Sequence, residues 1–158
     1  MSLSEFGQLE RAVRSYRTRG CRVVLTNGCF DILHVGHLRY LREARALGDV
    51  LVVGVNSDDS VRQLKGPGRP VNRAADRVEL LAGLSCVDCA VVFADLTPAR
   101  LILAVRPDVY VKGGDYSPEM LEETAVVRAF GGEVRIVGYV PAHSTTELVE
   151  RIRAVGNE

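Results

Sequence analysis

Two histidines three positions apart dominate the chemistry that this sequence could perform. His34 and His37 end the segment TNGCFDILHVGH, which starts at Thr26 directly after an apolar run. At a spacing of i and i+3, both imidazoles lie on one face of a helix. They stand beside unpaired backbone N–H groups at the positive end of the helix dipole. Such a position favours an anion, above all a phosphate, and Gly36 leaves room for a bulky ligand to approach.

The alternative without a ligand is a pair of surface histidines at the start of an ordinary helix. Against it stand Gly28, Phe30 and Asp31, which precede the histidines at fixed spacings. Six defined residues in one short segment are far more specific than two histidines alone. The segment therefore predicts a phosphate-binding site.

A second phosphate-compatible segment lies near the C-terminal end. Ser144, Thr145 and Thr146 precede Glu147, a spacing that predicts a helix with Ser144 as its cap and Glu147 at the third helical position. Such a capping box needs no ligand, so both interpretations stay open.

A glycine pair follows another apolar run, in the order Lys112, Gly113, Gly114 and Asp115. The glycines allow a nucleotide to approach the backbone closely, and the carboxylate could accept hydrogen bonds from ribose hydroxyls. An ordinary turn between a strand and a helix favours the same residue types.

These segments need a scaffold, and the hydrophobic pattern predicts one. Apolar runs alternate with stretches of helical period, which indicates a parallel sheet covered by helices. Strands are expected at 21–27, 49–56, 88–93, 108–113 and 133–140, and helices at 3–18, 35–47, 73–84, from 97, from 118 and over 143–155. The Gly/Pro-rich stretch 65–70 is expected to be a mobile surface loop.

The expected fold is a single doubly wound, Rossmann-like α/β domain over residues 1–158, with about five parallel strands. It divides into an N-terminal helix, 1–20, and a catalytic core, 21–158. Such sheets bind ligands at the carboxyl ends of their strands, where the strand order reverses. The polar segments described above all follow apolar runs, as this rule requires.

The balanced charge of the chain disfavours nucleic acid and anionic membranes as partners. Twenty basic residues balance twenty acidic ones, so the chain lacks the net positive field on which binding to nucleic acid or to an anionic membrane depends. The N-terminal stretch has no apolar segment of signal-peptide type, and no window approaches the roughly 18 apolar residues that cross a bilayer. A cytoplasmic protein is expected.

Cys86 and Cys89 form a CxxC pair, which suggests a redox or zinc site. A structural zinc site takes four ligands, and no second pair stands at a suitable spacing. Because Cys89 also opens the apolar run CAVVF, at least one thiol is expected to pack in the core as a small hydrophobic group.

The motif GxFDxxHxGH resembles the signature of the cytidylyltransferase-like nucleotidyltransferases, a branch of the HIGH-motif superfamily. The resemblance extends over nearly the whole chain from Cys21 onward. Within that family, the segments VNSDDSVRQLKGPGRPVN, VKGGDY and STT are most similar to the heptose-phosphate adenylyltransferases, in their stand-alone form without a sugar kinase.

The resemblance implies transfer of AMP from ATP to a sugar phosphate, D-glycero-D-manno-heptose 1-phosphate, with release of pyrophosphate. It implies Mg²⁺ as cofactor, held through the phosphates and with Asp31 as a candidate side-chain ligand. It also implies a homo-oligomer, with a dimer as the expected state.

Site residues follow from the same resemblance. The implied catalytic residues are His34, His37 and Lys65, and the implied acceptor-binding residues are Asp31, Lys65 and Arg77. In addition to the two histidines, the implied nucleotide-binding residues are Thr26, Asn27, Gly28, Cys29, Phe30, Lys112, Gly113, Asp115, Ser144, Thr145 and Thr146.

One departure from the family separates the alternatives. Many relatives, including the glycerol-phosphate cytidylyltransferases, have an Arg-Thr-x-Gly-Ile segment before Ser-Thr-Thr, and here that stretch ends Val140-Pro141-Ala142-His143. The missing arginine disfavours a glycerol-3-phosphate cytidylyltransferase. An FAD synthase-like adenylyltransferase and a non-catalytic nucleotide-binding protein remain as further alternatives.

Overall fold

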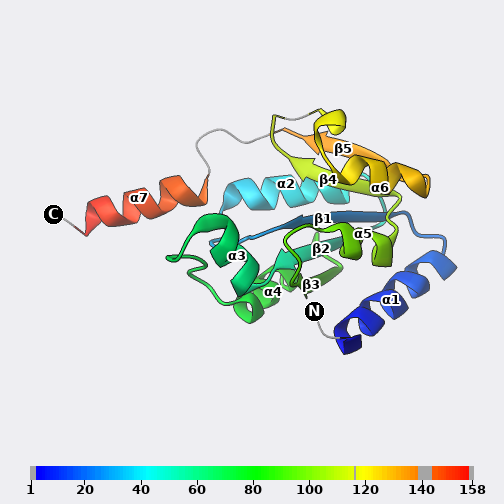
Figure 1. The fold of residues 1–158 in the computed structure, drawn as a ribbon, viewed down its shortest axis with the longest axis horizontal. Helices are drawn as coiled ribbons and strands as arrows, with labels where there is room; N and C mark the ends of the chain where they lie inside the picture. The colour runs from blue at the N-terminus through cyan, green and yellow to red at the C-terminus, as the bar shows by residue number, and fades with distance from the viewer. Residues whose placement is uncertain (1–2, 116, 139–143, 157–158) are drawn as a thin grey trace.

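A five-stranded parallel sheet forms the centre of the protein, as the sequence predicts (Figure 1). The computed structural model describes residues 3–115, 117–138 and 144–156. The strand order is β3-β2-β1-β4-β5. The strands are β1 (Val23–Gly28), β2 (Val50–Asn56), β3 (Cys89–Phe93), β4 (Val109–Gly113) and β5 (Glu133–Val137).

Helices connect the strands and cover the sheet. Those before β3 are α1 (Leu3–Thr18), α2 (Val35–Arg45), α3 (Asp58–Lys65) and α4 (Ala74–Ala82). After β3 come α5 (Ala99–Val105), the short 3₁₀ helix η1 (Pro118–Met120), α6 (Glu123–Ala129) and α7 (Thr145–Val155).

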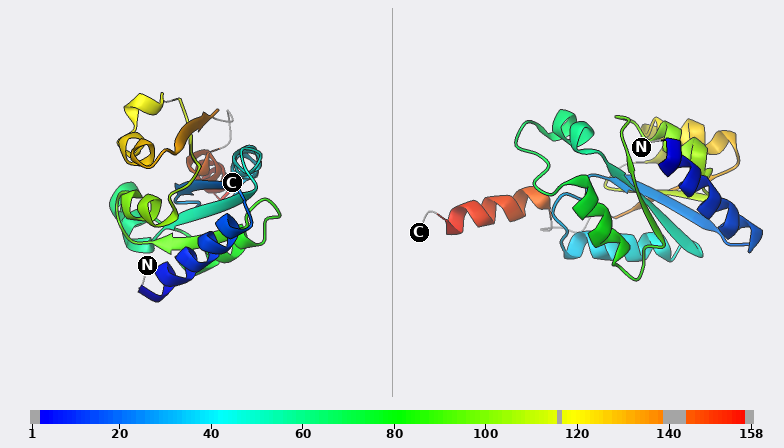
Figure 2. Two further views of the ribbon diagram at one scale, coloured as in Figure 1. Left: turned by 90° about the vertical axis from the view of Figure 1, so that its right-hand side faces the viewer. Right: turned by 90° about the horizontal axis from the view of Figure 1, so that it is seen from below.

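Two hydrophobic cores lie on opposite faces of the sheet, and alternate residues of each strand point into them. Val23 and Leu25 of β1 pack in one core with α1, α5 and α6, whereas Val24 packs in the other with α2 and α4. Burial on both faces explains why the inner strands are almost continuously apolar. The helices of the two layers are visible on either side of the sheet in Figure 2.

The strand order reverses between β1 and β4. β1 pairs in parallel with β2 on one side and with β4 on the other, in the register Val24 with Val109. The segment that carries His34 and His37 follows β1, and the glycine pair follows β4. The topology therefore brings the predicted phosphate-binding segment and the predicted nucleotide-binding glycine pair to the same point of the sheet edge.

The segment after β2 contains a helix that was not expected from the sequence, and this helix includes the first residue of the expected 65–70 loop. Residues 58–65 form helix α3, in which Ser57 Oγ accepts a hydrogen bond from the Ser60 amide. Ser and Asp at the start of an apolar-poor run favour a helix N-terminus as much as a turn. Lys65 is consequently the last residue of a helix rather than part of a loop.

The final helix projects beyond the sheet (Figures 1 and 2). Ser144 and Glu147 form the predicted capping box at its start. The expected end of the fifth strand and the start of the last helix, including His143, lie outside the described residues.

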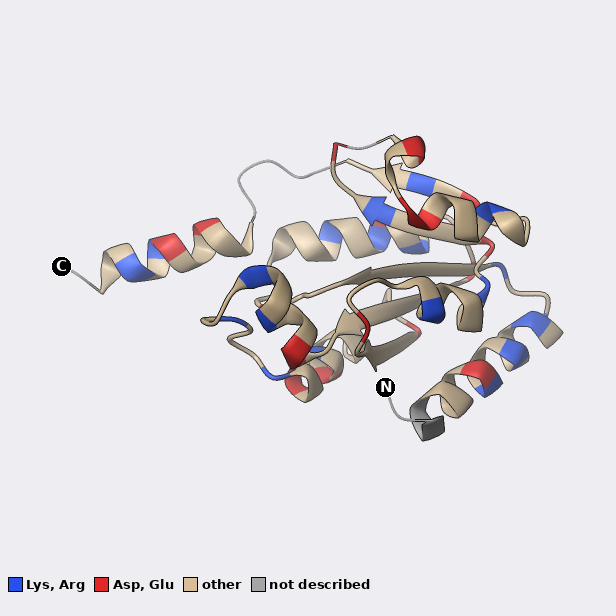
Figure 3. Cartoon of the chain, viewed as in Figure 1, with Lys and Arg blue, Asp and Glu red and all other residues tan. Residues whose placement is uncertain are grey.

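Among the described helices, none combines the length and the apolar character that crossing a bilayer needs. Acidic and basic residues are mixed along the chain rather than separated onto different elements (Figure 3). This distribution agrees with the balanced composition.

Candidate active site

A cavity of about 600 Å³ lies at the carboxyl end of the sheet, where the strand order reverses. It collects residues that are far apart in the sequence, from the ends of β1, α3 and β4 and from the starts of α2 and α7. Twelve of the predicted site residues line it: Asn27, Gly28, Cys29, Phe30, His34, His37, Lys65, Lys112, Gly113, Ser144, Thr145 and Thr146.

The two histidines form a stacked pair in this cavity. Their ring centroids are 3.9 Å apart and the ring planes differ by 25°. His34 is the N-cap of α2 by position, with extended backbone and no capping hydrogen bond from its side chain. His37 lies in the first turn of α2, and its ring also contacts Phe30, with the centroids 5.4 Å apart. The helix start therefore presents both imidazoles to the cavity together with unpaired backbone N–H groups.

Burial of the ring favours a neutral His37 in the ligand-free protein. Burial, and secondarily the neighbouring His34, lower the pKa of His37 to about 4. The His37 Nδ1 atom is buried without a hydrogen-bond partner among the described residues. A proton on Nε2 leaves only a lone pair buried at Nδ1, so we assign the neutral ring as a donor through Nε2.

The lowered pKa predicts a specific loss of stability in mild acid. Above pH 6.5 the imidazole is neutral in both the folded and the unfolded chain. As the pH falls from 6.5 to about 4, His37 becomes protonated in the unfolded chain but stays neutral in the folded chain. The free energy of unfolding therefore falls. Urea denaturation at pH 7 and pH 4.5 should show a smaller drop for His37→Asn than for the native protein. Equal drops in both proteins would contradict the assignment of a neutral His37.

Backbone geometry between β1 and α2 holds the loop tightly against this pair. Phe30 has a φ of 48°, the left-handed region that bulky side chains rarely adopt, and its side chain is buried. A Cβ atom at Gly28 would lie 3.1 Å from the Phe30 ring, so glycine leaves the space that this ring fills. Strained backbone of this kind is concentrated at functional sites.

Lys65 and Lys112 are the two lysines of the chain, and both line the cavity. Both also line an adjoining chamber of about 700 Å³, together with Arg69 and the segment 96–98. A compact, flexible ammonium group suits a phosphate that moves during a reaction. The two lysines therefore place positive charge in both chambers.

Asn27 is oriented by a tyrosine from the neighbouring strand. The buried Tyr110 hydroxyl donates to Asn27 Oδ1 at 2.6 Å. Because the carbonyl oxygen is used in this way, the side-chain NH₂ group is the part of Asn27 that remains for a ligand in the cavity. Asn27 lines both chambers, so it offers a neutral donor to either one.

Two predicted nucleotide-binding residues lie away from the cavity. Thr26 is fully buried, and its Oγ1 contacts Tyr40 Oη at 2.5 Å and the Val111 carbonyl at 2.9 Å. Its hydroxyl therefore fastens α2 to the sheet, and the expected contact of this side chain with nucleotide is wrong. Asp115 is exposed and does not belong to the cavity lining, so the structure does not bring it to the site.

Asp31 lines the adjoining chamber and has a structural role there, while its expected metal or acceptor contact stays a prediction. Its carboxylate accepts hydrogen bonds from the amides of Val71 and Asn72, at 2.8 and 2.9 Å, and pairs with Arg69 at 3.0 Å. Although burial raises the pKa of Asp31, these three partners outweigh it and hold the pKa below its ordinary value. The carboxylate thus ties the end of the 65–72 segment to the loop after β1, and its oxygens are occupied.

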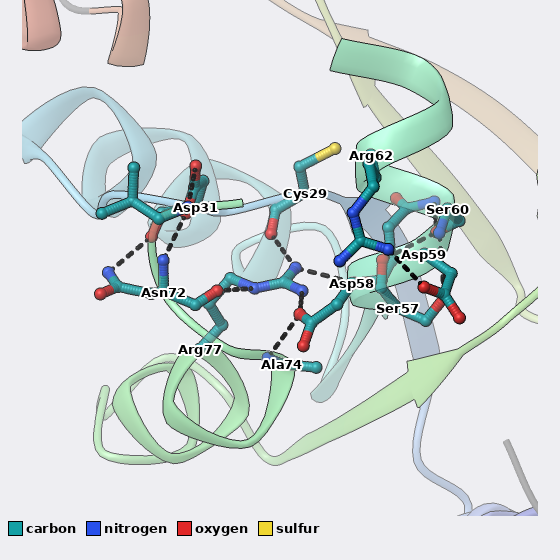
Figure 4. A network of polar contacts seen from close by, with 12 residues as sticks. Cys29, Asp31, Ser57, Asp58, Asp59, Ser60, Arg62, Asn72, Ala74 and Arg77 are labelled. Atoms are coloured by element: carbon teal, nitrogen blue, oxygen red, sulfur yellow. Dashed lines mark hydrogen bonds and ion pairs between the residues drawn. The ribbon is translucent and has the colours of Figure 1, made fainter. Parts of the chain in front are cut away.

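Arg77 is the largest fully buried side chain in the described part of the protein, which corrects the prediction that it binds the acceptor. Its guanidinium donates to the carbonyls of Cys29, Asn56 and Asn72, at 2.6, 2.7 and 3.0 Å, and pairs with Asp58 at 2.7 Å (Figure 4). With no exposed surface it cannot touch a substrate. It joins the loop after β1, the end of β2 and the start of α4 instead.

The cysteines do not form a second site. Cys86 packs in one hydrophobic core and Cys89 against the other, so the CxxC pair is divided between the two faces of the sheet. No cluster of three or more potential metal ligands exists among the described residues. Burial also raises the pKa of Cys29, which keeps this thiol protonated at neutral pH and makes it a poor nucleophile.

Four cavity residues were not predicted from the sequence: Tyr40, Leu121, Glu123 and Gly138. Tyr40 stands three positions after His37 on the same face of α2, and this spacing could have identified it. Glu123 opens α6 after an irregular segment, where no motif indicates its position.

Comparisons with known proteins agree with this geometry. A family model described as Cytidylyltransferase-like matches residues 25–151. The bifunctional protein HldE of Pseudomonas aeruginosa (strain UCBPP-PA14) is 55% identical over 149 residues, which cover 94% of this chain and 31% of that protein. HldE of Geotalea uraniireducens is 53% identical over 145 residues, 92% of this chain and 30% of that protein. The chain thus spans about a third of the length of the curated relatives that it matches.

A solved structure shares the fold. The lipopolysaccharide core biosynthesis protein from Thermoplasma volcanium GSS1 superimposes with a TM-score of 0.62 and 32% identity, covering 77% of this chain and 98% of that one. The family match includes the loop after β1, both lysines and the start of α7, which together form the cavity. The chain therefore belongs to the cytidylyltransferase-like family.

Proposed function

We propose that this chain is a nucleotidyltransferase that transfers AMP from ATP to a sugar phosphate and releases pyrophosphate. The observation that carries the proposal is the convergence of the stacked pair His34 and His37, Lys65, Lys112 and the start of α7 on one cavity. Imidazoles, ammonium groups and helix N-termini are the groups that bind polyphosphate.

The proposed acceptor is D-glycero-D-manno-heptose 1-phosphate. Support comes from the similarity of three segments to heptose-phosphate adenylyltransferases, from the HldE relatives, and from the solved neighbour, which is described as a lipopolysaccharide core biosynthesis protein. The adjoining chamber, which is lined by Arg69 and both lysines, offers a second anion-binding subsite for the phosphate of the acceptor.

The proposed reaction is in-line attack of an acceptor phosphate oxygen on the α-phosphorus of ATP, with pyrophosphate as the leaving group. The acceptor is already an anion, so no side-chain nucleophile is required. The protein aligns two mutually repelling anions and neutralises the charge that develops during transfer. His34 and His37 act as donors to the phosphates, and Lys65 and Lys112 supply positive charge between the chambers.

Nucleotidyltransferases of this family generally use a divalent metal ion, and we propose Mg²⁺. The described residues offer no cluster of ligands for it, and the Asp31 carboxylate is occupied by the 69–72 segment. We therefore propose that the phosphates themselves hold the ion, which would share in neutralising their charge.

Replacing Lys65 by alanine should chiefly weaken substrate capture. Lys65 lines both chambers, so its loss removes a positive charge that faces both anions. We expect KM to rise by about tenfold, with a smaller change in kcat, in steady-state pyrophosphate release. Arg62→Ala removes an exposed cation one turn earlier in the same helix, at a residue that lines neither chamber, and serves as the matched control. Unchanged constants in Lys65→Ala would remove this lysine from the mechanism.

A donor-by-acceptor screen tests the proposed function. ATP, CTP and GTP are combined with heptose 1-phosphate, glycerol 3-phosphate and flavin mononucleotide, and pyrophosphate release is measured. We expect the fastest release with ATP and the heptose phosphate. Preference for CTP with glycerol 3-phosphate, or for flavin mononucleotide, would assign the chain to one of the alternative enzymes. Nucleotide binding without release for any acceptor would instead make it a nucleotide-binding protein.

Other expectations remain predictions. A homo-oligomer, with a dimer as the expected state, would be seen by light scattering coupled to size-exclusion chromatography. The expected cytoplasmic location and the expected absence of nucleic-acid and membrane binding rest on the balanced charge and on the lack of a spanning helix among the described residues.

A further inference from the structure

A carboxylate lines a cavity that is otherwise suited to anions. Glu123, at the start of α6, faces both chambers together with Lys112. Glu123 Oε1 lies 3.9 Å from Lys112 Nζ, and the two side chains are only 16% and 24% exposed. A negative charge in this position repels polyphosphate, so its presence needs a physical reason.

The first turn of α6 is fixed in place, which makes the position of this carboxylate well defined. The next residue, Thr124, is buried, and its hydroxyl donates to the Pro118 carbonyl at the start of η1. Lys112 comes from a different element, the end of β4. The ion pair therefore links the helix to the strand end at the wall of the cavity.

Three roles are open to such a carboxylate. A metal ligand would need neighbouring ligands, and the described residues form no such cluster. A hydroxyl acceptor for a sugar would not need an ammonium group beside it. A counter-ion for Lys112 does need that proximity, and Glu123 is the carboxylate that acts on the charge of this lysine.

We propose that Glu123 is a positioning residue for the reaction, a resident counter-ion that holds the Lys112 ammonium group in the cavity until substrate phosphate replaces the carboxylate. The inference rests on the proposed function for its role in turnover, but the ion pair itself can be tested in the ligand-free protein.

The charges around Lys112 support this role. Burial lowers the pKa of Lys112, and Glu123 opposes this effect, as does Cys29 to a lesser degree. Glu123 also raises the pKa of the buried Tyr110, after the larger effect of burial. Lys65 and the imidazole of His37, which line the same cavity, supply no negative charge, and the Asp31 carboxylate of the adjoining chamber is already paired with Arg69. Loss of Glu123 would leave a half-buried ammonium group without its main counter-ion.

The first test measures the titration of Lys112 directly. With lysine labelled by ¹³C at the ε position, the chain gives two side-chain signals, and Lys65→Arg assigns them. In Glu123→Gln the Lys112 titration should move about one pH unit toward neutrality relative to the native protein. Glu122→Gln, which neutralises the exposed neighbour, should leave the titration in place. An unmoved titration in Glu123→Gln would overturn the proposal, and this measurement requires no turnover.

The second test connects the pair to the reaction. The pH dependence of kcat/KM for pyrophosphate release is measured, and its alkaline limb is the fall in kcat/KM at high pH. This limb should move toward neutrality by about one pH unit in Glu123→Gln but not in Glu122→Gln. Arginine keeps its charge at all these pH values, so on a Lys112→Arg background the Glu123→Gln substitution should no longer move the limb.

The two tests separate the modes of failure. A shifted lysine titration with an unmoved alkaline limb would overturn the positioning role. A raised KM for one substrate without any shift would identify Glu123 as a hydroxyl acceptor and would also overturn it. If the native protein released no pyrophosphate with any acceptor, the proposed function would fail, while the titration would still decide whether the ion pair exists.

Discussion

Replacing His37 by alanine is expected to lower turnover by about 10²-fold or more, the largest effect on activity that we predict. The ring stacks on His34, contacts Phe30 at a tilted angle and lines the cavity, so its loss removes a donor from the place where phosphate charge develops. Steady-state kcat in the pyrophosphate assay, measured with saturating ATP and acceptor, gives the result.

Arg39 provides the matched control for this substitution. It lies two residues further along the same helix, is exposed, and does not line the cavity. Arg39→Ala should retain turnover within about twofold, since surface changes away from a site have small effects. If His37→Ala kept full turnover and lost only stability, the imidazole would be structural rather than catalytic.

Replacing Arg77 by methionine should destabilise the protein by about 3–5 kcal/mol, the largest effect on stability that we predict. The substitution removes the guanidinium donor from three backbone carbonyls, those of Cys29, Asn56 and Asn72, and from the Asp58 carboxylate, which keeps its hydrogen bond from the Ala74 amide. Urea denaturation followed by circular dichroism measures the change. Arg77→Lys should recover only part of it, because an ammonium group cannot reproduce the planar fork of contacts.

Arg73→Met tests whether the effect belongs to the buried guanidinium. Arg73 precedes α4 and is exposed, so its loss should change the free energy of unfolding by less than about 0.5 kcal/mol. Near-native stability of Arg77→Met combined with a raised KM for the acceptor would restore the substrate-binding role that the burial of Arg77 contradicts.

Much of this architecture was predictable because its signals are local. The strands of the parallel sheet are continuous apolar runs, and the segment TNGCFDILHVGH identifies the turn and helix start that follow β1. The capping box of Ser144 and Glu147 was likewise predicted from spacing and is confirmed. In each case residues close in the sequence determine the structure, and helix or strand period is sufficient to recognise it.

The roles of Asp31 and Arg77 could not be predicted in this way. Arg77 shares a helix with exposed residues, and spacing alone does not show that the loop after β1, the end of β2 and the residue Asn72 converge on its guanidinium. Asp31 belongs to the motif, but the position of its partners depends on how the 65–72 segment folds back. Glu123 reaches the cavity only through the packing of α6. Each of these residues depends on contacts between distant segments, which a single sequence does not reveal.

The most direct test of the account is the titration of His37 with and without bound nucleotide. The chain has three histidines, so ¹³C-histidine spectra are simple, and His37→Asn assigns the signal. In the ligand-free protein the pKa should be about 4. With a saturating non-hydrolysable ATP analogue, the adjacent polyphosphate should favour the imidazolium form and raise the pKa by at least about one pH unit. If the His37 signal and its pKa stayed unchanged at saturation, the imidazole pair would not contact phosphate, and the proposed site would be wrong.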